Sequence, residues 1–145
     1  MSILNEPDMK ETIKELGGLL IQNINEGFDN YLSEIVEGSE EELYRLLNQL
    51  RIEQGPDYSF VDFYYGKLEK EEKDRIKERL PEYLQDIIKD YETEERIFYR
   101  LTDELFELTT YLTAKEYLFS TFYFCNTPCT VWGNYQRRYV IFRLF

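Results

Sequence analysis

The side chains that could carry chemistry in this chain are carboxylates at helical spacing and two neighbouring cysteines, with no histidine. Without histidine, Ser-His-Asp and Cys-His catalysis, histidine-based zinc enzymes and Glu-x-x-His di-iron bundles are excluded. Two cysteines cannot complete a four-ligand zinc site within one chain. Neither Gly17-Gly18 nor Gly55-Pro56 has the lysine and the spacing of a phosphate-binding loop. We therefore expect no metal, no cofactor and no enzymatic activity.

Acidic pairs three or four residues apart would share one face of a helix. Helical Mg²⁺-dependent nucleotide pyrophosphohydrolases use carboxylates on neighbouring helices and need no histidine. The pairs of this kind are Glu34 and Glu37, Glu82 and Asp86, and Glu104 and Glu107. With 29 acidic residues in 145, such pairs arise by chance, and most lie on stripes predicted to face solvent. This enzyme class is therefore only an alternative.

The two cysteines, Cys125 and Cys129, are separated by three residues that include a proline. If these residues form a tight turn, the thiols lie near one another and could act as a redox switch or a metal-assisted dimer contact. The favoured interpretation is a pair of buried thiols, which is usual for cytoplasmic proteins.

Composition predicts one folded, acidic domain spanning residues 1–145. Hydrophobic residues make up 43% of the chain, which is ample for a core, and aromatic residues make up 17%. The net charge of −12 repels phosphate backbones, so we expect no direct nucleic-acid binding, and it attracts basic partners. The chain opens without a signal peptide and has no apolar run long enough for a membrane span. A cytoplasmic location without membrane contact is expected.

Hydrophobic spacing predicts about five helices in the first 116 residues. An amphipathic helix is expected over 7–36, with a kink or break at its glycines. The best marked helix spans 39–54, where Ser39 and Glu42 have the spacing of a capping box and Gly55 ends the helix. The aromatic segment 58–65 is expected as a short helix or an irregular loop. Further helices are predicted over 69–79, from Pro81 to residue 91, and along an apolar seam over 98–112.

The last 29 residues differ from the rest, because they contain no acidic residue, three arginines and ten aromatic residues. Gly133-Asn134 matches a two-residue hairpin turn between strands at 129–132 and 135–144, and 121–125 would form a third strand. The predicted fold class is therefore mainly α: a helical bundle of about five helices followed by a small C-terminal antiparallel β-meander, within the α+β class.

Charge divides along the same boundary. Residues 1–116 hold 29 acidic and 14 basic residues, a net charge of −15, whereas residues 117–145 carry +3. The favoured interpretation is that the basic aromatic meander packs on the acidic helical body. The alternative is that Arg137, Arg138 and Arg143, together with exposed tyrosines, form a second contact surface.

Residues 39–67 resemble part of the nuclease-colicin immunity proteins. Ser39-Glu-Glu-Glu-Leu43 opens a helix, a turn follows, and Tyr64-Tyr65-Gly66-Lys67 is similar to the family's Tyr-Tyr-x-Lys at a matching distance. In that family the acidic second helix and the tyrosine pair bind a basic nuclease domain and block it. By position, the resemblance implies partner-binding roles for Glu40, Glu41, Tyr64 and Tyr65. Asp62 joins them because it adjoins Val61, which stands where the family has an interface aspartate.

The predicted function is that of an acidic protein-binding inhibitor of the immunity or antitoxin type, which neutralises a basic partner such as a nuclease. An acidic surface steers a cationic target, and tyrosines supply the buried anchors of an interface. Three alternatives stay open: a phage anti-defence inhibitor that mimics DNA charge, a self-associating structural module that forms a homodimer through the 98–112 seam and the C-terminal sheet, and the pyrophosphohydrolase.

Overall fold

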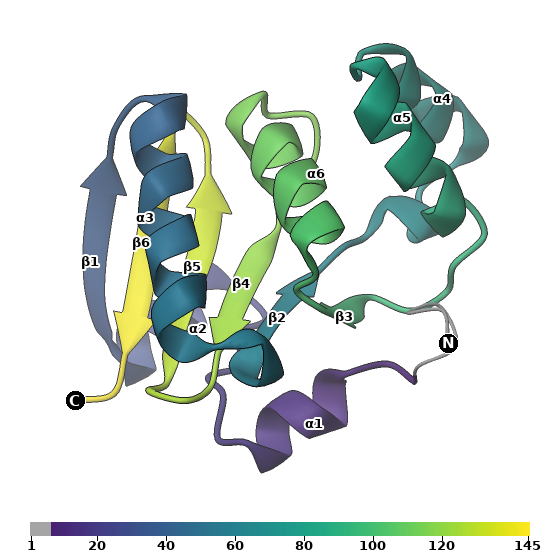
Figure 1. Ribbon diagram of the computed structural model, residues 1–145. Helices are drawn as coiled ribbons and strands as arrows, with labels where there is room; N and C mark the ends of the chain where they lie inside the picture. The colour runs from purple at the N-terminus through teal and green to yellow at the C-terminus, as the bar shows by residue number, and fades with distance from the viewer. Residues whose placement is uncertain (1–6) are drawn as a thin grey trace.

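The structure, a computed structural model, describes residues 7–145 and is built around a six-stranded antiparallel sheet (Figure 1). The strands follow the order β1-β6-β5-β4-β2-β3 across the sheet. Their bounds are β1 (Leu32–Glu37), β2 (Ser59–Asp62), β3 (Phe98–Arg100), β4 (Thr121–Phe124), β5 (Cys129–Asn134) and β6 (Arg138–Arg143). The α-helices are α1 (Lys10–Glu15), α2 (Ile24–Asn30), α3 (Glu40–Gln54), α4 (Lys70–Glu78), α5 (Glu82–Ile88) and α6 (Asp103–Ala114). Short 3₁₀ turns occupy Pro56–Tyr58, Tyr65–Lys67 and Lys89–Tyr91.

The predicted fold class is wrong, because the sheet is the centre of the molecule and not a small appendage to a helical bundle. The C-terminal strands do form the expected antiparallel meander, β4-β5-β6. Three strands from the predicted helical body extend it on both sides: β1 pairs with β6, and β2 pairs with β4 and β3. The acidic body and the basic meander are therefore interleaved in one sheet.

The helix predicted over 7–36 is replaced by two short helices and the edge strand β1. The chain turns at Gly17, whose positive φ of 84° suits glycine, and packs closely at Gly18. A Cβ at Gly18 would lie 2.6 Å from Cγ2 of Ile13 and 2.8 Å from Sγ of Cys125. The helical spacing of apolar residues misled the prediction, since Ile13 lies in the core whereas Ile35 is 60% exposed on β1.

The predicted helix 39–54 is confirmed as α3, and its capping box is complete. The Glu42 amide donates to the Ser39 hydroxyl over 3.1 Å, and the Ser39 amide donates to the Glu42 carboxylate over 3.0 Å. Gly55, with φ of 92°, ends the helix. The helix predicted over 69–79 is confirmed as α4, and Pro81 directly precedes α5 as its N-cap.

The aromatic segment 58–65 contains a strand, β2, where a helix or loop was predicted. The seam over 98–112 is also divided, because Phe98 belongs to β3 and α6 begins after Thr102, whose hydroxyl caps it. The helical part of the seam is buried inside this chain's own core, with Leu105 and Leu108 fully covered. Because it is buried, this part of the seam cannot contact a second copy of the chain.

The turn of the β5–β6 hairpin follows the predicted turn residues, Gly133 and Asn134, and does not include them. Gly133 and Asn134 are the last residues of β5, and the turn is made by Tyr135, Gln136 and Arg137. The φ values of 61° at Gln136 and 52° at Arg137 supply the left-handed backbone of the turn. Gly133 serves packing instead, because a Cβ there would lie 2.7 Å from the Thr113 side chain.

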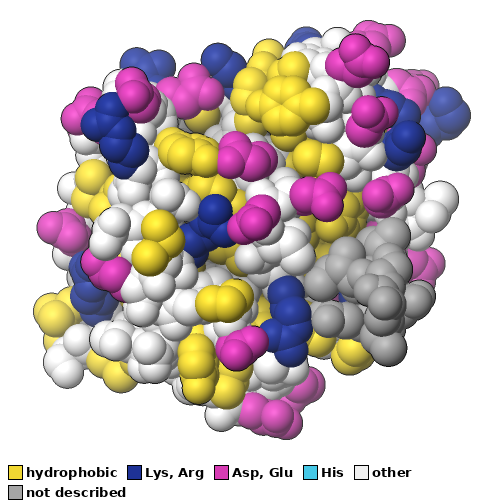
Figure 2. Space-filling view, viewed as in Figure 1, with side chains coloured by type: hydrophobic (Ala, Val, Ile, Leu, Met, Phe, Trp, Pro, Cys, Tyr) yellow, Lys and Arg dark blue, Asp and Glu magenta, His cyan; other side chains and the backbone are white. Residues whose placement is uncertain are grey.

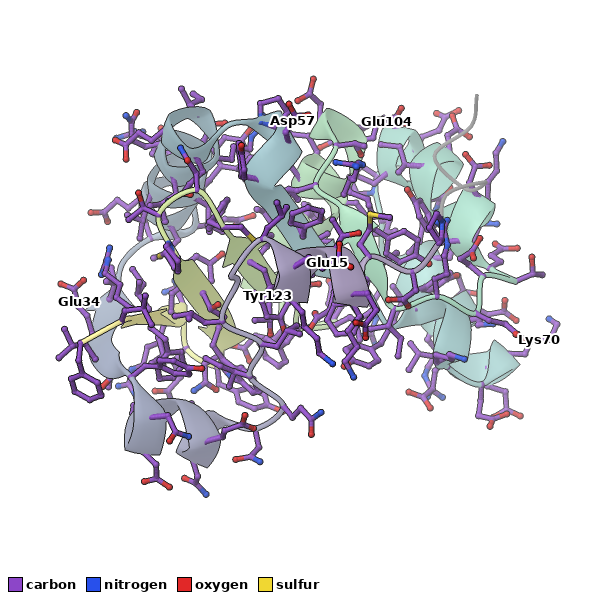
Figure 3. All side chains as sticks on the ribbon, turned by 90° about the horizontal axis from the view of Figure 1, so that it is seen from below. Glu15, Glu34, Asp57, Lys70, Glu104 and Tyr123 are labelled. Atoms are coloured by element: carbon purple, nitrogen blue, oxygen red, sulfur yellow. The ribbon has the colours of Figure 1, made fainter. Side chains whose placement is uncertain are left out.

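The two faces of the sheet are covered differently. One face, here the helical face, carries Phe122, Val131 and Ile141 and packs against α3 and α6, which lie in front of the sheet in Figure 1. The other face, here the groove face, carries residues such as Phe60 and Phe142 and is covered by α1, the segment 17–23 and α2. Seen from below, α1 with its last residue Glu15 lies across the sheet near Tyr123 (Figure 3).

Candidate functional site

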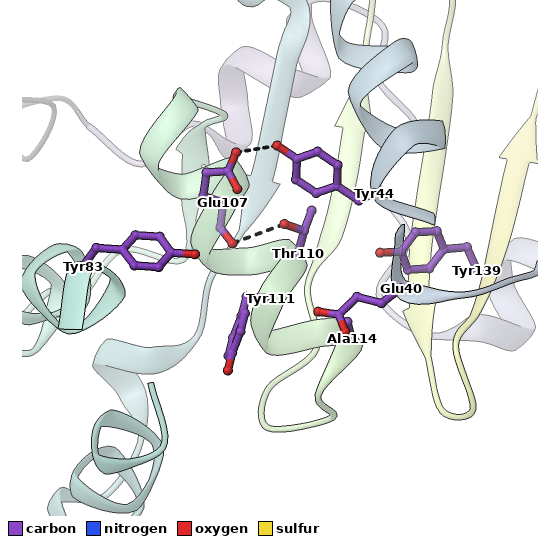
Figure 4. A pocket seen from close by; sticks show the side chains of 8 residues that line it. All are labelled: Glu40, Tyr44, Tyr83, Glu107, Thr110, Tyr111, Ala114 and Tyr139. Atoms are coloured by element: carbon purple, nitrogen blue, oxygen red, sulfur yellow. Dashed lines mark hydrogen bonds between the residues drawn. The ribbon is translucent and has the colours of Figure 1, made fainter. Parts of the chain in front are cut away.

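A cavity of about 180 Å³ opens on the helical side of the molecule, where α3, α5 and α6 meet (Figure 4). Its lining is rich in tyrosine and glutamate: Glu40, Tyr44, Tyr83, Glu107, Thr110, Tyr111, Ala114 and Tyr139. We refer to it as the tyrosine–glutamate pocket. The surface around it carries many Asp and Glu side chains, with hydrophobic side chains gathered between them near α5 and α6 (Figure 2).

Helical spacing positions most of this lining. Glu40 and Tyr44 are four residues apart on α3, and Glu107 and Tyr111 are four apart on α6, so each helix presents a Glu–Tyr pair to the pocket. Tyr83 reaches in from α5 and is 58% exposed. The inner wall includes Tyr139 of β6, which is buried under the helices. Residues of both the helical layer and the sheet therefore line the pocket.

The two helices are joined at the pocket wall by a hydrogen bond that the Tyr44 hydroxyl donates to the Glu107 carboxylate. This hydrogen bond, with a smaller contribution from partial burial, raises the pKa of Tyr44 to about 12. Tyr44 therefore stays neutral and keeps its donor role at ordinary pH. Glu107 still has lone pairs free for a cation, because a carboxylate accepts about four hydrogen bonds.

Lys115 shows how this lining holds a cation. Its ammonium group lies 3.2 Å from the Glu40 carboxylate and 5.5 Å from the centroid of the Tyr111 ring. The hydrogen bond to Glu40 and its charge raise the pKa of Lys115. A carboxylate and a tyrosine ring thus share one ammonium group, which is the arrangement that favours cation binding at a protein surface.

Two hydroxyl groups of the pocket already have acceptors. The Tyr44 hydroxyl donates to the Glu107 carboxylate, and the Thr110 hydroxyl donates to the Phe106 carbonyl within α6, 2.6 Å away. Within residues 7–145, no three Asp, Glu or Cys side chains converge on a metal-binding geometry. The carboxylates and tyrosine rings of the lining are groups that can hold a cation.

Two of the predicted partner-binding residues, Glu40 and Glu41, lie on the helical side. Glu40 lines the tyrosine–glutamate pocket, and Glu41 points outward and pairs with Arg45 on the next turn of α3. Tyr65, which the immunity-protein resemblance paired with Tyr64, is fully buried and donates its hydroxyl hydrogen to the Lys73 carbonyl over 3.1 Å. Its role in the described chain is therefore structural, and it cannot anchor a partner without local unfolding.

The other two, Asp62 and Tyr64, lie together on the groove face. Asp62 is buried at the end of β2 and contacts Tyr123 of the groove-face core, and Tyr64 is 40% exposed just beyond it. The sheet therefore separates these residues from Glu40. Sequence reasoning missed Tyr44, Tyr83, Glu107 and Tyr111, although the repeated Glu–Tyr spacing of four residues on two helices was a usable signal.

The predicted second surface is largely neutralised by the edge strand. Arg138 pairs with Glu37 over 2.7 Å, and Arg143 pairs with Glu34 over 3.5 Å, while Arg137 is exposed in the hairpin turn. The basic segment does pack against the chain's own acidic residues, but against β1 where helices were expected. The same contacts place Glu34 and Glu37 on opposite faces of a strand, so they cannot form the helical carboxylate pair considered above.

Cys125 and Cys129 are free and buried, as the favoured interpretation predicted. They lie on different faces of the sheet: Cys125 packs with Ile13 of α1, whereas Cys129 belongs to the core under α3 and α6. Burial raises the pKa of Cys125 to about 11 and also raises that of Cys129. Both sulfurs are therefore held as unreactive thiols.

No protein-family model, no curated protein and no solved structure matches this chain. Across residues 7–145 the helices are too short or too polar to cross a lipid bilayer.

Proposed function

We propose that this protein is a cytoplasmic binding protein that neutralises a basic protein partner, in the manner of an immunity protein or antitoxin, through the tyrosine–glutamate pocket. The observation that supports this most directly is the composition of the pocket, where Glu40 and Glu107 stand among four tyrosine side chains. Basic side chains are the groups that such a lining holds best, because the carboxylates supply charge and the rings supply cation–π contact.

The contacts already present support a specific pose. Lys115 occupies the site between Glu40 and Tyr111, which leaves Glu107 and the exposed ring of Tyr83 for an incoming lysine or arginine. Tyrosine loses little conformational freedom on binding and is enriched among residues that dominate binding energy. We therefore assign Tyr83 as the aromatic anchor and Glu107 as the charge partner.

Long-range charge supports the same partner class. The chain carries a net charge of −12, and the basic residues of the C-terminal strands are largely paired with β1. A basic protein would be steered to this surface, and its association rate would fall as salt screens the attraction. A nuclease domain is a basic protein of the expected kind.

The test begins by finding the partner at the pocket itself. A photo-crosslinking residue at Tyr83 in the full chain should capture a basic protein, and the same residue at Tyr58, which is 39% exposed and lies outside the pocket, should not. The captured protein is then purified, and its activity is measured with and without this chain. Inhibition that weakens with added salt is expected, whereas equal capture at both positions or an unaffected activity would reject the proposal.

Variants then test the assigned residues. Replacing Tyr83 with Ala should weaken the complex by about 2 kcal/mol or more, which corresponds to roughly 30-fold in Kd. Tyr58→Ala is the matched control, because Tyr58 is 39% exposed and lies outside the pocket. A loss of affinity caused by the control and not by the pocket variant would assign the interface elsewhere.

A second candidate function, self-association, is favoured by strand β1. Among residues 7–145 no strand pairs with the outer edge of β1, and two apolar side chains, Leu32 and Ile35, are exposed there. The charges of Glu34 and Glu37 are balanced by arginines of β6, so they protect the edge weakly. An antiparallel pair of two β1 strands centred on Ile35 would place Glu34 opposite Val36 and avoid glutamate–glutamate contact.

Analytical ultracentrifugation over a range of protein concentrations tests this second candidate. A dimer that Ile35→Lys converts to monomer supports pairing through β1. Ile52→Lys is the matched control, because Ile52 is 65% exposed on α3 and does not belong to β1, so this variant should leave the dimer intact. A monomer at all concentrations would rule out self-association.

A further inference from the structure

We propose that the groove face holds a second binding site, in which the Asp62 carboxylate receives the ammonium or guanidinium group of an organic cation. The site is a cavity of about 260 Å³ at the end of β2. The residues that matter for recognition are Asp62, Tyr64, Phe119, Thr121, Trp132 and Tyr135. This cavity and the tyrosine–glutamate pocket lie on opposite faces of the sheet. The proposed cation site and the proposed function can therefore be tested independently.

Asp62 is held in place by strand β4. Its Oδ1 accepts a hydrogen bond from the Thr121 amide over 2.8 Å, which aims the carboxyl group along the groove face. Its Oδ2 receives a long contact, 3.5 Å, from the Tyr123 hydroxyl, and the Thr121 side chain also stabilises the charged form of the carboxyl group. An oxygen of a carboxylate has two lone pairs, so Oδ2 retains capacity to accept from a ligand.

No lysine or arginine of the described chain forms an ion pair with this buried carboxyl group. Burying a carboxylate without a cation is unfavourable, and a purely structural acceptor at this position would be served by a neutral side chain. Burial accordingly raises the pKa of Asp62 to about 7, against the opposing effect of the Thr121 and Tyr123 hydrogen bonds. An arriving cation would supply the charge partner that residues 7–145 do not provide.

The walls of the cavity suit an organic cation better than a metal ion. They are aromatic: Tyr64, Trp132 and the edge-to-face pair of Phe119 and Tyr135, whose ring centroids are 4.7 Å apart. Aromatic walls with one carboxylate favour alkylammonium and guanidinium groups through cation–π contact. A metal ion would need more oxygen ligands than Asp62 offers.

The cavity continues into a larger one, of about 500 Å³, which shares Ile21, Gln22 and Tyr64 with it. The second cavity has apolar lining from Leu20 and Phe98, and its charged lining consists of Lys10, Lys14 and Glu26. The lysines outnumber the glutamate there, whereas Asp62 is the charged residue that lines the first cavity, so a cationic end is favoured at Asp62. The expected ligand therefore carries its charged group at Asp62 and an apolar stem that lies toward Phe98.

The only tryptophan in the sequence, Trp132, lines the cavity, so its fluorescence reports binding directly. The protein is titrated with n-butylammonium and n-butylguanidinium, with n-butanol as the neutral match, and the Thr121 amide is followed by NMR. A saturable change with the cations and a much weaker one with butanol are expected. Equal responses to the cations and to butanol would overturn the proposal.

Asp62→Asn keeps the size of the side chain and its acceptor for Thr121 but removes the charge. It should weaken cation binding by about tenfold or more, because a charge-assisted contact is lost. Asp57→Asn is the matched control, since Asp57 is an exposed aspartate at the opposite end of β2 and changes the net charge equally. Thermal unfolding confirms that both variants fold, and unchanged binding in folded Asp62→Asn would reject the site.

The cation could belong to a free amine or to a lysine side chain of a protein. A lysine blocked at both backbone ends is compared with n-butylammonium to distinguish them. Tighter binding of the blocked lysine, with added NMR shifts at Lys10 and Lys14, would assign a protein side chain. Exclusive binding of the simple cations would assign a small molecule, and binding of none of the three compounds would reject the proposal.

Discussion

The hydroxyl of Tyr44 donates a hydrogen bond to the carboxylate of Glu107, and this contact joins α3 to α6 above the sheet. The two residues are 63 positions apart in the chain and belong to the same pocket wall. A single interaction thus contributes both to the packing of the helical layer and to the shape of the candidate binding site.

Replacing Tyr44 and Glu107 should destabilise the protein by amounts that are not additive. Tyr44→Phe and Glu107→Gln are each expected to destabilise the protein slightly, and the double variant should lose about 1 kcal/mol less than the sum of the two. The figure is kept small because the pair is only partly buried and solvent screens it. Urea unfolding of all four proteins measures the coupling, and strictly additive losses would show that the contact contributes nothing.

Asp62 should make stability fall with rising pH. Its carboxyl pKa is about 7 in the folded protein and 3.8 in the reference state, so the unfolded chain ionises first. The stabilisation is complete below pH 3.8 and is lost as pH rises through 7, by up to roughly 4 kcal/mol. Tyr64 and Tyr123, which face the carboxyl group, have raised pKa values and do not titrate in this window.

Chemical denaturation at pH 5 and pH 8 checks this dependence. Asp62→Asn should be the more stable protein at pH 8 and should lose most of the fall between the two values. Asp57→Asn, which alters an exposed carboxylate, should keep the wild-type profile. If Asp62→Asn and wild type respond to pH alike, the burial of Asp62 is not what sets the dependence.

Ser39→Ala should destabilise the protein by about 1 kcal/mol, because it removes the hydroxyl that accepts from the Glu42 amide. The hydrogen bond that the Ser39 amide donates to the Glu42 carboxylate, with a smaller contribution from the Ser39 side chain, lowers the pKa of Glu42. The stabilisation from Glu42 is therefore present above its ordinary pKa and is lost as pH falls through the lowered value. Ser39→Asp keeps a cap acceptor and serves as the control. Thermal unfolding near neutral pH should rank wild type and Ser39→Asp above Ser39→Ala.

Gly66→Ala should lower the free energy of unfolding more than Gly17→Ala does. A Cβ at Gly66 would lie 1.9 Å from the Glu94 carbonyl oxygen and 3.0 Å from that of Tyr91, and backbone atoms cannot easily move aside. A loss of about 3 kcal/mol is expected from such overpacking. Gly17→Ala is the comparison: it adds a methyl group into open space and meets only the backbone strain of a positive φ, about 1–2 kcal/mol.

Several elements could be predicted because their signals are local. The capping box of Ser39 and Glu42 and the stop at Gly55 defined α3, Pro81 marked the start of α5, and the apolar strand at 121–125 predicted β4. Each of these signals acts between residues that are close in sequence, so no knowledge of distant partners was needed.

The errors arose where a distant partner decides the local structure. The segment 32–37 has apolar residues at spacings that also suit a helix, and it becomes a strand because β6 offers its free edge and two arginines for Glu34 and Glu37. Gly133 signalled a turn and instead permits close approach to Thr113. Of the predicted partner-binding residues, Tyr65 is buried in the core. The sheet separates Asp62 and Tyr64 from Glu40.

The sequence by itself determined the acidity of this protein, its lack of histidine chemistry, its capped helix α3 and the three strands at its C-terminus. Only the tertiary structure decided that these strands form the middle of a six-stranded sheet. It also decided that Tyr44 and Glu107 share one pocket and that Asp62 is buried without an ion pair to any residue in 7–145. The reason is physical: charge and helix capping depend on residue type and near neighbours, whereas strand pairing, pockets and burial are set by contacts between residues far apart in the chain.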